Sequence, residues 1–93
     1  MGAPDTIIFR MLNEQEGRDT LISRSQAKQI LSRANHFKYI VLDFDGVLTI
    51  GQAFADETFR VFASNNPDIV ITPTRTNQDI ENMIARARRE TEK

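Results

Sequence analysis

The sequence contains no cysteine and no tryptophan, and it has only three prolines and four glycines in 93 residues. The absence of cysteine excludes disulfide bonds, thiolate metal sites and thiol catalysis, and it fits a reducing compartment. The glycines are too scattered to form a glycine-rich phosphate loop. No apolar run approaches the roughly 20 residues of a membrane helix, and the first residues lack a signal-peptide pattern. We therefore expect a cytoplasmic protein that does not bind membranes.

The sequence also lacks an excess of either sign of charge, because its net charge is only −1. The molecule as a whole therefore has no field that attracts nucleic acid or acidic membranes, and we expect no nucleic-acid partner. Its length indicates a single domain over residues 1–93, ending in a short polar tail from about residue 88. So small a domain leaves little protected interior, which favours a homodimer or docking on a larger protein.

Three apolar segments, residues 6–12, 39–44 and 68–74, have the composition of strands. Ile40, Val41 and Leu42 are consecutive rather than alternating with polar residues, which predicts a strand covered on both faces.

Three other segments have helical periodicity. Ser23 followed by Gln26 is a capping-box pattern that predicts the start of the first helix, and the second covers residues 52–64. Thr76 with Asp79 predicts the start of the last helix. The order β-α-β-α-β-α predicts a small α/β domain with a mainly parallel sheet packed against helices.

The stretch "LDFDGVLT" at residues 42–49 resembles the first motif of the haloacid-dehalogenase-like phosphatases. That resemblance implies that Asp43 is a nucleophile that also holds Mg²⁺, and that Asp45 is a general acid. The remaining parts of such an enzyme are missing, because only Arg75 can serve as the phosphate-neutralising cation and no further strand ends in an acidic pair. The alternative is a buried strand followed by a turn, with no metal and no cofactor. We prefer this second interpretation.

Two other stretches, "SRSQAK" and "VLDFDGV", lie within the segment Leu21–Val61, and a third, "IGQAFADETFRVF", lies at its end and reaches Phe62. This segment resembles the small bacterial STAS-like domains, relatives of the sulfate transporter and anti-sigma factor antagonist domains. The resemblance implies a STAS-like fold and a regulatory role through protein–protein contact, with a histidine-kinase-like ATPase as a possible partner. In the better-known antagonists a phosphorylated serine lies at the loop that corresponds to "IGQAF". Here that hydroxyl is gone, and only Thr49 offers one nearby.

The loop and helix at residues 45–60 therefore form the predicted docking surface. Asp56 and Arg60 are four residues apart, which suits either an ordinary ion pair within the helix or a charged rim for a partner. Phe54 and Phe59 lie far apart around a helix, so we expect one of them to face away from the sheet. The candidate partner-binding residues are Thr49, Gln52, Phe54, Asp56, Glu57 and Arg60.

These observations favour a non-catalytic signalling module. Two alternatives stay open, a degenerate Mg²⁺-dependent phosphatase that uses Asp43 and Asp45, and a purely structural oligomerisation domain.

Overall fold

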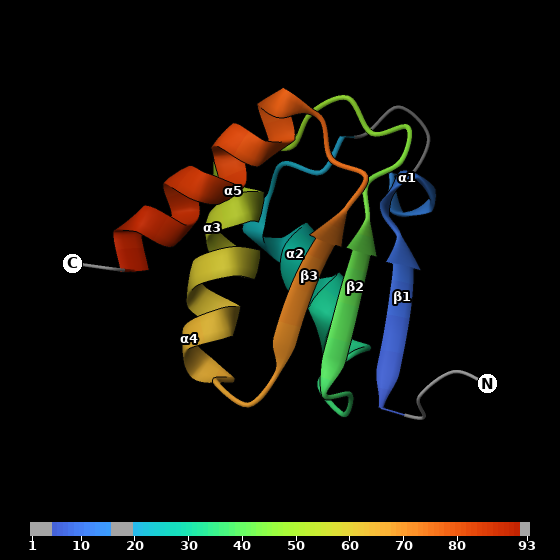
Figure 1. Cartoon of the computed structure of the whole chain (residues 1–93), viewed down its shortest axis with the longest axis vertical. Helices are drawn as coiled ribbons and strands as arrows, with labels where there is room; N and C mark the ends of the chain where they lie inside the picture. The colour runs from blue at the N-terminus through green and yellow to red at the C-terminus, as the bar shows by residue number, and fades with distance from the viewer. Residues whose placement is uncertain (1–4, 16–19, 92–93) are drawn as a thin grey trace.

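The computed structural model describes residues 5–15 and 20–91 of the chain (Figure 1). Its elements, in chain order, are β1 (Thr6–Arg10), α1 (Met11–Glu14), α2 (Arg24–Ser32), β2 (Tyr39–Asp43), α3 (Gln52–Asp56), the π-helical segment η1 (Glu57–Phe62), α4 (Ala63–Asn65), β3 (Val70–Thr74) and α5 (Gln78–Thr91). None of these helices has the length and apolar character needed to cross a membrane.

The three strands form one parallel sheet in the order β1-β2-β3. Parallel neighbours need crossover connections, and right-handed crossovers that advance in one direction place their helices on the same face of the sheet. Figure 1 shows this arrangement, with α2, α3, α4 and α5 all on one side. Pro73 lies within β3, an edge strand, where proline is tolerated. The predicted mainly parallel α/β fold is confirmed.

The hydrophobic core lies between this face of the sheet and the helices. Ile40 and Leu42 of β2 point into it, whereas Val41 between them points to the opposite face and is only half-buried. Nothing in residues 5–15 and 20–91 covers that opposite face, where Ile8, Tyr39 and Val70 are exposed by 63%, 42% and 49%. The prediction that both faces of β2 are covered is wrong, because no helix of the described chain packs over Val41.

Local signals set most of the element boundaries. The capping box at the start of α2 is confirmed, because Ser23 accepts from the backbone of Gln26, whose side chain in turn accepts from Ser23. The first strand ends at Arg10, and the short helix α1 follows where we expected strand to residue 12.

The prediction that Thr76 caps the last helix is wrong. The side chain of Asn77 accepts from the Ile80 N–H over 2.9 Å and caps α5 in its place. This helix continues to Thr91, so the tail expected from about residue 88 is helical that far; residues 92–93 lie outside the described chain.

The predicted helix at residues 52–64 is continuous in space but not uniform, because its central part, η1, widens into a π-helix. It lies between α2 on one side and α5 on the other. Phe54 and Phe59 are consequently both buried, with 1% and 4% exposure, and Arg88 of α5 lies 5.3 Å above the ring of Phe59. Neither ring is therefore left exposed for a partner, because α5 covers the side of the helix that the sheet does not.

Candidate functional site

Gly51 fixes where the helix that carries most of the candidate residues begins. Its N–H donates to the carbonyl oxygen of Leu21 over 2.8 Å, and Leu21 pairs with Ile50 in a short parallel bridge. A Cβ atom at position 51 would lie 2.8 Å from the Cα of Ile22, closer than real Cβ atoms approach other atoms. The absence of a side chain at Gly51 therefore lets the start of α3 lie directly against the chain that enters α2.

The capping box of α2 places Arg24 next to this helix. The Gln26 side chain accepts from the N–H groups of Ile22 and Ser23, and it donates to the Thr20 carbonyl oxygen over 2.8 Å. These bonds hold the segment before α2 in one conformation. Arg24, the first residue of the helix, then extends towards α3.

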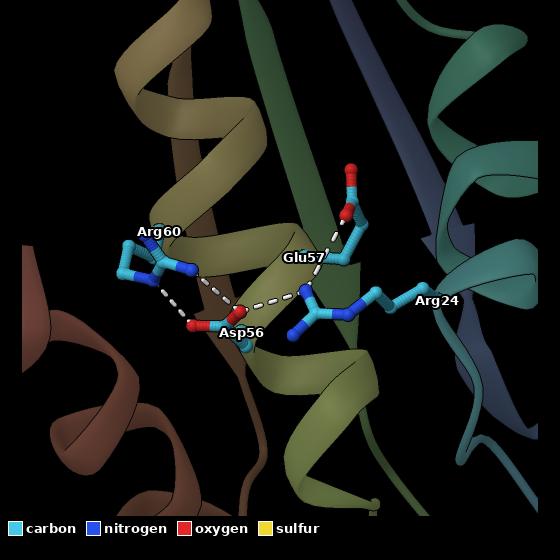
Figure 2. Close-up of polar contacts among 4 residues, drawn as sticks. All are labelled: Arg24, Asp56, Glu57 and Arg60. Atoms are coloured by element: carbon cyan, nitrogen blue, oxygen red, sulfur yellow. Dashed lines mark hydrogen bonds and ion pairs between the residues drawn. The ribbon is translucent and has the colours of Figure 1, made fainter.

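Asp56 is the centre of an ion-pair cluster that joins α2 to the α3–η1 helix (Figure 2). Its carboxylate accepts from Arg60 Nε over 2.5 Å and from Arg60 Nη2 over 2.8 Å, while Arg24 Nη1 lies 2.7 Å from Oδ2. The hydrogen bonds from Arg60, with Arg24 beside them, lower the pKa of Asp56 from 3.8 to about 2. Asp56 is therefore negatively charged at any pH near neutrality, and it orients two guanidinium groups.

Glu57 extends the cluster towards the interior. Glu57 is only 7% exposed, and its carboxylate lies 3.6 Å from the same Nη1 atom of Arg24 that contacts Asp56. Figure 2 shows both contacts leaving one nitrogen of Arg24. Thr58, the next residue, is also buried, and its hydroxyl has no hydrogen-bond partner in the part of the chain that the structure describes. Both residues lie in η1, and irregular π-helical turns of this kind occur frequently at functional sites.

A pocket of about 510 Å³ opens beside the cluster, between α2, α3–η1 and α5. Its lining residues are Arg24, Gln52, Ala53, Asp56, Arg60, Met83, Arg86 and Ala87. The polar side chains thus come from three helices, while Ala53, Met83 and Ala87 form an apolar wall. Pockets of this size hold ligands or protruding side chains in many proteins. This pocket is the candidate functional site.

The structure separates the predicted partner-binding residues into accessible and buried groups. Gln52, Asp56 and Arg60 line the pocket, and Thr49 is exposed, with its hydroxyl donating to Asp79 of α5 over 2.6 Å. The side chain of Phe54 lies in the core, so it offers no surface to a partner in this conformation.

Two arginines of the pocket were not among the candidates from the sequence. The sequence alone does not distinguish a partner contact from an ordinary surface arginine at Arg24, and Arg86 lies in a helix end rich in both signs of charge. Arg86 makes no ion pair or hydrogen bond with any described residue. Only the packing of α5 against α3 brings it to Asp56 and Arg60, and no local pattern in the sequence encodes that contact.

The phosphatase-like motif lies at a different place, the carboxyl end of β2. The side chain of Asp43 accepts from Arg75 Nε over 3.1 Å and from Nη2 over 2.7 Å, and its Oδ1 also accepts from the Asp45 N–H over 3.0 Å. The Asp45 amide above all, and then Arg75, lower the pKa of Asp43. Both oxygens of the proposed nucleophile are therefore engaged, and an attack on phosphorus would require Arg75 to leave.

The surroundings of this motif are those of a turn. Gly46 has a φ of +83°, which glycine adopts without strain, and Arg75 has a φ of +52°, which is unusual for a residue with a side chain. The Asp45 side chain is 70% exposed. Within residues 5–15 and 20–91, no group of three or more His, Cys, Asp or Glu side chains is placed to hold a metal ion.

Comparison with known families identifies the kind of domain. The model of the family described as "STAS-like domain of unknown function (DUF4325)" matches residues 26–81, which include β2, the helix formed by α3, η1 and α4, and β3. The chain belongs to this family. The match to the STAS-like family extends beyond the segment Leu21–Val61, on which the resemblance in the sequence rested, to the first turn of α5. Comparisons with curated proteins and with solved structures gave no significant match.

Proposed function

We propose that this STAS-like domain is a non-catalytic regulatory module that docks onto another protein through the pocket surface. The accessible part of that surface consists of Gln52, Asp56 and Arg60, with Arg24 and Arg86 beside them. A histidine-kinase-like ATPase is the partner that the family resemblance suggests. The observation that supports the proposal is the convergence of five polar side chains from three helices on one pocket.

The chemistry of these residues suits recognition of a protein. Arginine is enriched where protein interfaces concentrate their binding energy, and its guanidinium forms directional hydrogen bonds to a partner. The Asp56 carboxylate holds Arg24 and Arg60 in place before any partner arrives, which reduces the ordering cost of association. Thr49 and Asp79 tie the neighbouring loop to α5, so the edge of the surface is also fixed.

Site-specific photo-crosslinking in the native host tests this proposal. A photoreactive residue at Gln52, which is exposed, is expected to capture a histidine-kinase-like ATPase, identified by mass spectrometry. The matched control carries the same residue at His36, which is exposed in the connection between α2 and β2. Capture of the same proteins from both positions, or capture only of a second copy of this chain, would contradict the proposal.

A second candidate function, oligomerisation, is favoured by the uncovered face of the sheet. Ile8, Tyr39 and Val70 are exposed together across the three strands. However, three strands of five residues present a flat face of only about 250 Å², well below the roughly 800 Å² that each partner buries in a standard interface. Any dimer through this face is therefore weak, and sedimentation of the wild type and the Ile8→Lys variant at high concentration measures it.

A further inference from the structure

The charge of the pocket differs in sign from the charge of the whole molecule. Three of its lining residues are arginines and one is an aspartate, whereas the chain carries a net charge of −1. Glu57 adds one negative charge behind Arg24, which leaves the cluster with an excess of one positive charge. Excess positive charge in a recess with partly apolar walls attracts anions more strongly than the same charge on a flat surface.

Several hydrogen-bond donors in the pocket have no partner among the residues that the structure describes. Arg24 uses the single atom Nη1 for both of its ion pairs, so its Nε and Nη2 donate to no described residue. In Figure 2 neither dashed line from Arg24 starts at its second terminal nitrogen. The guanidinium of Arg86 on the opposite wall is also unpartnered within the described chain. A guanidinium donates in a planar fork and accepts no hydrogen bonds, so its complement is an oxyanion with two acceptor oxygens.

We infer that the pocket binds an oxyanion, a carboxylate or a phosphate group, between Arg24 and Arg86. Asp56 acts as a positioning residue, because its carboxylate contacts Arg24 and Arg60 but leaves Nε and Nη2 of Arg24 available to a ligand. The apolar wall of Met83 and Ala87 accommodates the carbon atoms that carry the group. This inference rests on the proposed docking function, in which an acidic or phosphorylated side chain of the partner supplies the oxyanion. A free small molecule with the same group is the other source.

Titration of the ¹⁵N-labelled full chain, at constant ionic strength, tests the site with defined probes. Inorganic phosphate and glutarate represent free oxyanions, and a glutamate-rich hexapeptide represents the acidic segment of a partner. The same hexapeptide with glutamine in place of glutamate is the control probe. Gln52, Ala53 and Ala87 line the pocket, so their amide signals report binding. We expect them to move saturably with at least one anionic probe and not with the glutamine peptide.

Two variants locate the binding. Arg86→Gln removes one unpartnered, exposed donor group and is expected to weaken binding about tenfold, the effect of losing one charge-assisted contact. Arg24→Gln is expected to do the same. Arg89→Gln makes an identical change of charge on the same helix, at an exposed residue that does not line the pocket, and is expected to leave the affinity unchanged.

Each outcome supports or overturns the inference. Saturable binding that is lost in Arg86→Gln and kept in Arg89→Gln supports it, and the probe that binds identifies the source of the oxyanion. If no anion binds saturably, or if Arg89→Gln weakens binding as much as Arg86→Gln does, the pocket is not an oxyanion site. Crosslinking from Gln52 tests partner docking independently of the anion titration. If crosslinking succeeds and no anion binds, the docking proposal stands and the oxyanion site is refuted; if both experiments fail, both proposals are refuted.

Discussion

Replacing Asp56 by asparagine removes one charge from the centre of the ion-pair cluster and preserves the size of the side chain. Arg60 then keeps at most one of its two hydrogen bonds to this side chain, of 2.5 Å and 2.8 Å, and both Arg60 and Arg24 lose the negative charge that faces them. The remaining partner of Arg24 is Glu57, at 3.6 Å. We therefore expect Asp56→Asn to destabilise the folded protein and to loosen the contact between α2 and α3.

The size of this effect follows from the pKa of Asp56, which folding lowers from 3.8 to about 2. A change of that size corresponds to about 2 kcal/mol for a pair that is shielded from water. The side chains of Arg24 and Arg60 are 49% and 38% exposed, and solvent screening at such positions reduces the contribution to about 1 kcal/mol. We expect Asp56→Asn to lower the free energy of unfolding at pH 7 by this amount.

The pH dependence gives the sharper test. Because folding lowers the pKa of Asp56, its contribution is complete above the ordinary pKa of an aspartate and is lost as the pH falls towards about 2. Urea unfolding, followed by circular dichroism between pH 7 and the acid limit of folding, should show the wild type and Asp56→Asn converging at low pH. Asp68→Asn, at an exposed residue without an ion pair in the described chain, is the control. A stability difference that stays constant down to pH 3 would refute the assignment of the effect to the Asp56 carboxylate.

Three further predictions concern single positions. Gly51→Ala places a methyl group 2.8 Å from the Cα of Ile22, and we expect it to lower the free energy of unfolding by about 2 kcal/mol in urea titrations. Asn77→Ala removes the cap of α5 and should cost about 1 kcal/mol, with faster amide exchange in the first turn of that helix. Asp43→Asn removes the carboxylate that binds Arg75, so we expect a lower urea midpoint but unchanged capture of the partner from position 52. Loss of capture with unchanged stability would instead favour a functional role for Asp43.

The parts of the fold that the sequence predicts correctly are those with local causes. The start of α2 follows from the reciprocal bonds of Ser23 and Gln26, which act within one helical turn. The parallel sheet follows from the alternation of strands and helices. The error at the start of α5 is also local, because Thr76 and Asn77 are both good capping residues and their order alone does not select between them. In the described chain, one face of the sheet is uncovered because the strand order β1-β2-β3 places both crossovers on the other face. A consecutive run of apolar residues in β2 does not specify that order.

The candidate site is less predictable because it depends on contacts between distant helices. The Asp56–Arg60 pair lies within one helix and is confirmed. The burial of Phe54 depends on the helices packed around it, and the contribution of Arg86 to the pocket depends on where α5 crosses α3. The π-helical segment has no signal in the residues Glu57–Phe62 that we recognise. Whether Gln52, Asp56 and Arg60 bind a partner stays a prediction.

The strand order β1-β2-β3 also bears on how the chain folds. Neighbours in the sheet are neighbours along the chain, so no pairing between the first strand and the last has to form. Pairing of β1, β2 and β3 closes two crossover loops, residues 11–38 and 44–69, and the entropic cost of closing a loop rises slowly with its length. Folding can therefore begin with either strand pair and proceed to the other. On both routes β2 is ordered in the first step, so we expect substitutions in β2 to change the folding rate more than substitutions in β1 or β3.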